Sequence, residues 1–282
     1  MTHPTHRTHA THRARNRTHR THRTRTRTTL AALAAAALLL TGCGASTSAT
    51  PTPSTTAVRG DITVFAAASL TATFTEIADA FEQANPGANV TFNFAGSSAL
   101  VTQLTEGARA DVFASADEAN MKKATDAGLV AGDPVIFASN TLEIAVPPGN
   151  PAGVSSFADL DTPGLRLVIC APQVPCGAAT QKIATALGMT LAPVSEENAV
   201  TDVLGKVASG EADAGVVYRT DVQGAGSKVE GISFPETDDA VNRYPIAVLE
   251  GSAEPGVAQA FIDFVNDYQG QAILAVAGFG KG

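Results

Sequence analysis

The stretch ITVFAAASL, residues 62–70, joins the end of a β-strand to a turn made only of small residues. A strand is indicated by the β-branched and aromatic side chains of Ile62, Val64 and Phe65. Three alanines and Ser69 follow, ahead of a run with helical spacing. Small side chains let a ligand approach the backbone, and the first amides of a helix carry partial positive charge. Ser69 is therefore either the N-cap of a helix or a donor to a bound anion.

The same arrangement recurs further along the chain, in residues 93–101, NFAGSSALV. Ser97 and Ser98 again follow a predicted strand and begin a helical pattern. Ligands of open α/β sheets bind beyond the carboxyl ends of the strands, so both serine turns would face one crevice. Neither turn is a phosphate loop, because neither contains G-x-x-x-x-G-K or G-x-G-x-x-G.

Strands and helices alternate from Gly60 onward, which predicts an α/β fold with βαβ units. In the first expected helix, residues 70–85, the apolar side chains fall on one face. The roughly 220 residues that follow Gly60 exceed one typical domain. We therefore expect two lobes, each a mixed, mostly parallel sheet flanked by helices, with a ligand cleft between them. Lobe 1 is predicted at 60–142 and 246–282, and lobe 2 at 143–245.

The N-terminal segment has the features of an export signal. Residues 1–28 hold all six histidines and eight of the 19 Lys and Arg residues. The apolar run Leu30–Leu40 is too short to span a bilayer and suits a signal peptide, which we predict at 1–42 with an unusually long Thr/His/Arg arm. A true start further downstream, or metal binding by the histidine repeat, is an alternative for this arm.

Residues 40–43, LTGC, resemble the lipobox of bacterial lipoproteins. The resemblance implies cleavage before Cys43 and acylation of its thiol; an ordinary signal peptide with a chance cysteine is the alternative. The Ser/Thr/Pro-rich remainder of 43–59 is typical of a flexible tether. The predicted location is outside the cell membrane, with a lipid anchor in its outer face.

Composition excludes several classes of function. Without residues 1–42, 11 basic residues remain against 27 acidic ones, a net charge of about −16, which opposes nucleic-acid binding. No histidine follows residue 28, which excludes Ser-His-Asp and Cys-His catalysis and any histidine-containing metal site. A nucleophilic Ser69 or Ser97 would need a lysine or carboxylate base that no motif supplies. We therefore predict neither an enzyme nor a cofactor.

Two cysteines, Cys170 and Cys176, remain after the predicted lipidation site. In an exported protein such a pair more often forms a disulfide than a metal site. Six residues apart across a loop that contains proline, they can reach bridging geometry.

Five motifs occur in order over residues 61–282: ITVFAAASL, NFAGSSAL, ADVFASAD, VPCG and GVVY. Together they resemble the periplasmic molybdate-binding proteins of ABC uptake transporters. The resemblance implies the type II periplasmic-binding-protein fold, in which two lobes close on an oxyanion. It also implies molybdate or tungstate as ligand, molybdenum only as the bound oxyanion, a permease as partner, and a monomer.

The resemblance also implies a set of ligand-binding residues. Ser69 and Ser97 would donate through hydroxyl and amide, and Tyr218, which ends GVVY, through its phenol. Val200 would donate through its amide. So would Cys176, which replaces the alanine of the family's VPAG turn. A disulfide at Cys176 would either order this binding loop or only stabilise the exported protein.

The five groups are all neutral donors, which suits a fully deprotonated dianion. A protonated oxyanion such as hydrogen phosphate needs an acceptor, and neither serine turn nor QVPCG contains Asp or Glu. Another oxyanion such as sulfate, or a small organic anion, is the main alternative ligand. A serine-based enzyme and a surface adhesion lipoprotein are the alternatives from other classes.

Overall fold

The computed structural model describes residues 57–282. The predicted signal peptide at 1–42, the lipidation site Cys43 and nearly all of the tether at 43–59 lie outside the described residues. Within 57–282, no helix combines the length and the apolar character needed to cross a membrane.

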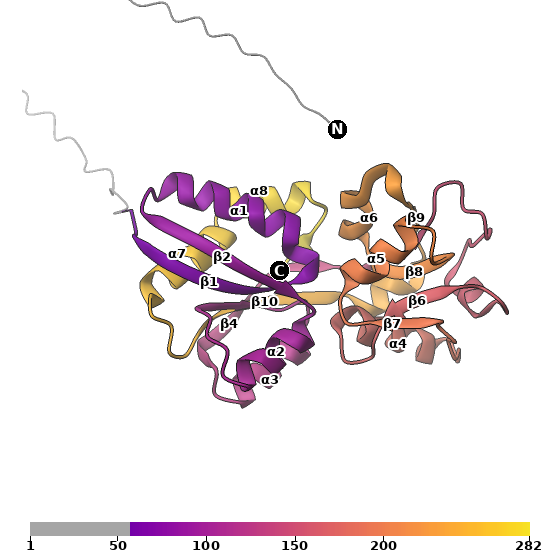
Figure 1. Cartoon of the computed structure of the whole chain (residues 1–282), viewed down its shortest axis with the longest axis horizontal. Helices are drawn as coiled ribbons and strands as arrows, with labels where there is room; N and C mark the ends of the chain where they lie inside the picture. Colours follow the sequence, from indigo (N-terminus) through magenta and orange to yellow (C-terminus); the bar gives the residue numbers. More distant parts are fainter. Residues whose placement is uncertain (1–56) are drawn as a thin grey trace, which may run out of the picture. The chain divides into compact units, whose positions relative to one another are not determined.

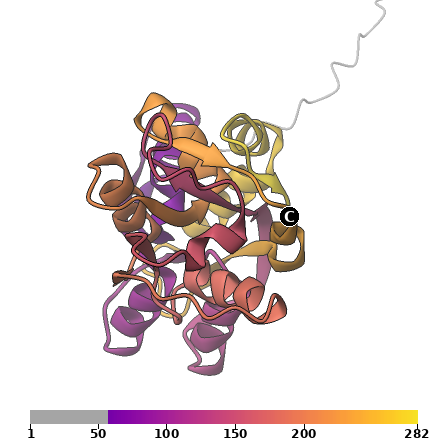
Figure 2. The same ribbon diagram turned by 90° about the vertical axis from the view of Figure 1, so that its right-hand side faces the viewer.

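Two β-sheets organise this part of the chain (Figure 1). The first has the order β11-β4-β10-β3-β1-β2 and consists of β1 (Gly60–Ala67), β2 (Ala88–Ala95), β3 (Val112–Ala114), β4 (Val130–Asn140), β10 (Asn242–Leu249) and β11 (Gly280–Lys281). The second has the order β7-β6-β8-β5-β9 and consists of β5 (Leu142–Val146), β6 (Leu167–Cys170), β7 (Ser195–Glu197), β8 (Ala214–Tyr218) and β9 (Glu230–Ile232). Figure 2 views the molecule from the side of the second sheet.

Helices flank both sheets. Those of the first sheet are α1 (Thr71–Ala84), α2 (Ser97–Thr105), α3 (Glu118–Asp126), α7 (Pro255–Asn266) and α8 (Tyr268–Val276). Those of the second are α4 (Pro175–Ala186), α5 (Val200–Ala208) and α6 (Arg219–Ala225). Short 3-10 helices occur at Ala68–Leu70, Phe157–Asp161, Gly226–Lys228 and Pro235–Ala240.

The first sheet has an apolar core on each face. On one face, Phe74 and Phe81 of α1 pack against Phe261 of α7, with ring centroids 6.1 and 5.5 Å apart. On the other face, α2 and α3 cover the sheet through side chains such as Leu100 and Met121. Each fully buried side chain of this kind contributes about 1.5–3 kcal/mol, so the helices hold the strand ends in fixed positions.

The sheets are mixed, as predicted, with more antiparallel pairs than a mostly parallel sheet implies. Strand β1 runs parallel to β2 and β3, and β6 runs parallel to β7 and β8. Apart from the short edge strand β11, which pairs antiparallel with β4, the antiparallel pairs come from β10 and β5. Strand β10 lies between β3 and β4, and β5 lies between β8 and β9. These strands follow a direct passage between the sheets, without the helical crossover that makes neighbours parallel.

The chain passes between the sheets at two places that position the site. Asn140 ends β4 in the first sheet, and Leu142 begins β5 in the second. The return precedes Asn242, because β10 pairs with β4 from that residue onward. The first-sheet pairing therefore begins ahead of the predicted boundary at 245/246, and the division into lobes stays a prediction.

Candidate functional site: an uncharged cavity at four strand-to-helix turns

One small cavity brings all five predicted binding residues together. Its lining comes from turns of both sheets and consists of Ala67, Ala68, Ser69, Gly96, Ser97, Ala116, Val174, Pro175, Cys176, Val200 and Tyr218. None of these side chains is charged. The cavity is small, with a volume of about 10 Å³, which is close to the space of one water molecule.

Of the helix N-termini that border this cavity, four are not capped by a side chain. They belong to the 3-10 helix that precedes α1 and to α2, α4 and α5. By contrast, Asp117 caps α3 and Asp267 caps α8. The first amides of a helix have no intrahelical partner, so these turns leave N–H groups available to a ligand.

The capping interpretation of the two serines is wrong. The N-caps are Ala67 for the 3-10 helix and Gly96 for α2, so that both serines lie inside the first turn. The Ser69 hydroxyl instead lies 3.1 Å from the Tyr244 hydroxyl. Ser97 Oγ accepts a hydrogen bond from the Ala116 N–H at 3.0 Å, which leaves the Ser97 proton free to be donated elsewhere.

Tyr218 ends β8 and is only 1% exposed. Its hydroxyl has no hydrogen-bond partner among the described residues. Burial raises the pKa of this phenol well above its usual value, so the group stays protonated and can act as a donor. An unpaired buried hydroxyl costs about 1–3 kcal/mol, which a ligand oxygen could offset by accepting its proton.

A disulfide joins Cys170, at the end of β6, to Cys176, in the first turn of α4. The Cα atoms are 5.7 Å apart. The turn between them is tightly packed, since a Cβ on Gly177 would lie 2.0 Å from the Ala171 carbonyl oxygen. The bridge therefore ties the N-terminus of α4 to the sheet.

A close approach of two backbones borders the cavity. A Cβ on Gly96 would lie 2.0 Å from the Asn198 carbonyl oxygen, so a side chain does not fit. Gly96 follows a strand of the first sheet, and Asn198 follows a strand of the second. The two halves of the site are therefore in contact, and only glycine permits this spacing.

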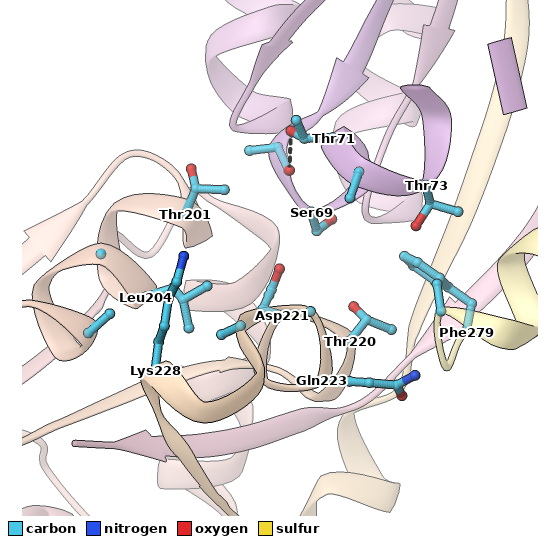
Figure 3. A pocket seen from close by; sticks show the side chains of 17 residues that line it. Ser69, Thr71, Thr73, Thr201, Leu204, Thr220, Asp221, Gln223, Lys228 and Phe279 are labelled. Atoms are coloured by element: carbon cyan, nitrogen blue, oxygen red, sulfur yellow. Dashed lines mark hydrogen bonds between the residues drawn. The ribbon is translucent and has the colours of Figure 1, made fainter. Parts of the chain in front are cut away.

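A second, larger cavity adjoins the first and shares Ala68 and Ser69 with it (Figure 3). Its volume is about 480 Å³, and Asp221 and Lys228 line it. Asp221 points from α6 toward the turn that carries Ser69 (Figure 3). A carboxylate in the wall disfavours a bare anion, so the small uncharged cavity is the better anion site.

Asp221 is half-buried and accepts a hydrogen bond from the Tyr218 N–H at 2.9 Å. Burial raises the pKa of this carboxyl to about 7, against the opposing effect of that hydrogen bond. Asp117, next to the cavity residue Ala116, also has a raised pKa because it is buried, although Asn120 and Ser115 bond to it. The described residues contain no cluster of three or more side chains that could hold a metal ion.

Two residues near the cavity were not predicted from the sequence. Tyr244 of β10 reaches the Ser69 hydroxyl, and Asn140 at the end of β4 lies 3.5 Å from Tyr244. Adjacent polar residues at both passages between the sheets were the one signal in the sequence that could have pointed to these two residues.

Comparison with known proteins identifies the family. Residues 62–280 match the family described as bacterial extracellular solute-binding protein. The chain belongs to this family. The motif-based resemblance to periplasmic molybdate-binding proteins is confirmed, and so is the two-sheet α/β fold.

This solute-binding protein has similar relatives among characterised and solved proteins. It is 50% identical over 249 residues to the molybdate-binding protein ModA of Mycobacterium tuberculosis (strain H37Rv), covering 87% of the chain and 95% of the relative. It is 34% identical over 250 residues to the molybdate-binding protein ModA of Escherichia coli (strain K12), covering 84% and 95%. The solved periplasmic molybdate-binding protein of Azotobacter vinelandii superimposes with a TM-score of 0.67 at 25% identity, covering 78% and 99%.

Proposed function

We propose that this solute-binding protein captures molybdate, and also tungstate, outside the cell membrane and delivers it to the permease of an ABC importer. The observation that carries the proposal is the Tyr218 hydroxyl, buried at an uncharged cavity and lacking a hydrogen-bond partner among the described residues. The relatives named for molybdate support the same ligand.

Each proposed binding residue contributes a neutral donor. Ser69 and Ser97 donate through hydroxyl and amide, Tyr218 through its phenol, and Cys176 and Val200 through amides at the starts of α4 and α5. A hydrogen bond to a charged group contributes about 1.5–3 kcal/mol. Six or seven of them sum to roughly 10–20 kcal/mol before ordering and desolvation costs, which allows micromolar to nanomolar affinity.

A site built only of donors selects for charge state rather than for the central atom. Molybdate and tungstate carry the same charge and have the same tetrahedral shape, so we expect both to bind. Hydrogen phosphate carries a proton that needs an acceptor, and no carboxylate lines the cavity.

The proposal also covers the localisation and the oligomeric state of the protein. Cleavage of residues 1–42 and acylation of Cys43 would hold the protein at the outer face of the membrane through the tether at 43–59. A monomer suffices, since residues of a single chain line the cavity.

Calorimetric titration of the purified protein with molybdate, tungstate, sulfate and phosphate tests the ligand. We expect tight binding of the first two and much weaker binding of phosphate; sulfate, a fully deprotonated dianion of the same shape, is the alternative ligand that the titration compares with them. Binding of sulfate without molybdate would replace the proposed ligand, and binding of none would favour a surface interaction protein.

Substitution tests the site. Ser69→Ala and Ser97→Ala should each weaken molybdate binding at least tenfold, about 1.4 kcal/mol. Ser98→Ala is the matched control, because Ser98 neighbours Ser97 but its side chain does not line the cavity. Wild-type affinity in either of the first two variants would remove that serine from the site.

A further inference from the structure

We propose that Asn140 and Tyr244 are positioning residues that hold the Ser69 hydroxyl as a hydrogen-bond donor toward the cavity. The inference rests on the proposed function, in which Ser69 binds the oxyanion. A serine hydroxyl can donate or accept, so its usefulness to a dianion depends on which way its proton points.

The orientation begins at a backbone group. Asn140 is 4% exposed, and its Oδ1 accepts the Thr141 N–H at 3.0 Å. A backbone N–H can only donate, so this contact fixes which end of the Asn140 amide is oxygen. The Nδ2 group therefore faces the other way, where it donates to Thr220 Oγ1 at 2.8 Å and to the Tyr244 hydroxyl at 3.5 Å.

The orientation of the Asn140 amide determines the direction of the Tyr244 hydroxyl proton. The Tyr244 ring is fully buried, and burial raises the pKa of the phenol above its usual value, so the hydroxyl keeps its proton. The oxygen accepts from Asn140. The proton therefore points toward Ser69 Oγ at 3.1 Å rather than toward the nearby Tyr218 hydroxyl, which makes no hydrogen bond with a described residue. The opposite arrangement would leave the Tyr244 proton facing only the Tyr218 hydroxyl, which lies outside hydrogen-bond geometry.

The Ser69 oxygen accepts the hydrogen bond from Tyr244, so the Ser69 hydroxyl proton must point away from Tyr244. Ser69 lies at the junction of the two cavities, half-buried, so that its proton is presented to the space where a ligand would lie. The three side chains therefore form a one-directional relay, Asn140 to Tyr244 to Ser69, which ends in a donor.

The second serine of the site needs no such relay. Ser97 Oγ accepts directly from the Ala116 backbone N–H at 3.0 Å, so the backbone alone orients it. The two hydroxyls thus reach the same donor state by different routes. A change at Tyr244 should act through Ser69 and leave the contribution of Ser97 intact.

A double-mutant cycle tests the relay. Molybdate affinity is measured calorimetrically for the wild type, Tyr244→Phe, Ser69→Ala and the double variant. We expect Tyr244→Phe to weaken binding about fivefold when Ser69 is present and by less than about 1.5-fold when it is absent. Equal losses in both backgrounds would overturn the relay, because a general structural effect does not depend on Ser69.

Two further variants serve as controls. In the Ser97→Ala background, Tyr244→Phe should keep its full effect, since Ser69 is still present; loss of the effect there would contradict the proposal. Tyr268→Phe, the same change at a tyrosine that is 92% exposed, should leave affinity unchanged.

Two further outcomes, a variant that does not fold and a wild type that binds another ligand, have their own measurements. If thermal melting shows that Tyr244→Phe does not fold, Asn140→Asp replaces it in the same cycle, because a carboxylate oxygen would accept the Tyr244 proton and reverse the relay. If the wild type binds sulfate instead of molybdate, the cycle is run with sulfate. A wild type that binds neither overturns both proposals, whereas additive losses in a protein that binds overturn only the relay.

Discussion

The proposed function assigns single side chains at the cavity to a ligand rather than to the stability of the protein alone. The Tyr218 hydroxyl is the clearest case, since it is buried without a partner among the described residues. Leaving a buried hydroxyl unpaired opposes folding, whereas pairing it with a charged ligand favours binding. Stability and affinity should therefore respond in opposite directions to its removal.

Tyr218→Phe tests this directly. We expect the unfolding free energy of the ligand-free protein to stay within about 0.5 kcal/mol or to rise, since no hydrogen bond is lost. Molybdate affinity should fall by roughly 10- to 100-fold, corresponding to one hydrogen bond to a charged group. Urea unfolding and calorimetry provide the two values.

The exposed Tyr268 supplies the matched control, because Tyr268→Phe removes a hydroxyl that faces solvent. Neither stability nor affinity should change there. A large loss of stability in Tyr218→Phe would mean that its hydroxyl has a partner in the ligand-free protein.

At the scale of elements, the site is a meeting of helix starts from two sheets. The turn before α2 and the turn before α5 approach so closely that Gly96 has no room for a Cβ beside the Asn198 carbonyl. The backbone of Gly96 is extended, with φ −60° and ψ 139°, which any residue can adopt. Space, rather than conformation, therefore requires glycine at this position.

In Gly96→Ala, the added Cβ should clash with the Asn198 carbonyl oxygen and push the two halves of the site apart. We expect a loss of molybdate affinity of tenfold or more, because the two turns cannot close to the distance seen here. Small-angle scattering of the molybdate-saturated variant should give a larger radius of gyration than the saturated wild type.

Gly205→Ala is the matched control. Gly205 lies within α5, and a Cβ there would meet no atom within 4 Å. The change should raise stability by about 0.5–1 kcal/mol through helix propensity and leave affinity unaltered. If Gly96→Ala bound molybdate as tightly as Gly205→Ala, the contact would have no role in closure.

The disulfide at α4 gives a prediction of its own. Replacing Cys170 and Cys176 together by alanine should lower stability by about 2 kcal/mol, from the entropy of the short loop they close. The melting temperature should fall by roughly 4–8 °C. Affinity should fall as well if the bridge orders the amide of residue 176.

Reduction of the wild type with a thiol reagent is the companion measurement for the same bridge. A lower melting temperature with unchanged affinity would leave the disulfide a purely stabilising role. No change in either quantity would show that the bridge does not contribute.

The sequence predicted most elements but not all of their relations. Local patterns indicated β1, α1 and β2, because apolar spacing and flanking Pro86 and Gly87 are visible within a short window. Strand β4 was not predicted, since Gly132 and Pro134 interrupt its pattern and pairing with the distant strands β10 and β11 holds it in the sheet.

At the site, the sequence could supply residues but not their partners. The five predicted binding residues all line one cavity. Their assignment came from motif resemblance, because no local rule distinguishes a ligand-binding serine from a cap. Ser69 and Tyr244 are 175 positions apart in the sequence, and no pattern near either residue predicts their contact.

At the scale of the whole molecule, hydrogen bonds between elements of the two sheets link the sheets to each other. Asn140 bonds to Thr220 at 2.8 Å, and Gln223 of α6 donates to the Val276 carbonyl at the end of α8 at 2.8 Å. Asn120 of α3 reaches the Gln173 carbonyl at 3.5 Å.

The stability of the whole molecule should depend on pH through Asp221. Its pKa is about 7 in the folded protein against an ordinary value of 3.8, so the folded state holds a proton that the unfolded chain has already lost. Stability from this group is therefore present below about pH 4 and is lost as pH rises to about 7.

Asp221→Asn should remove this dependence, since an amide oxygen can still accept the Tyr218 N–H. At pH 8 the variant should be more stable than the wild type, on the order of 1–2 kcal/mol after allowance for the carboxyl's partial exposure. At pH 4 the two should be equal. Urea unfolding across pH 4–8 measures this, and a difference that is constant with pH would contradict it.

The absence of charged side chains around the small cavity also affects how the filled protein moves in an electric field. None of the described residues lining it can neutralise a bound dianion. The filled form should therefore carry two more negative charges than the empty form, with a lower isoelectric point. Native electrophoresis or anion-exchange chromatography could then separate filled from empty molecules and report the fraction loaded in a cell extract, without a labelled ion.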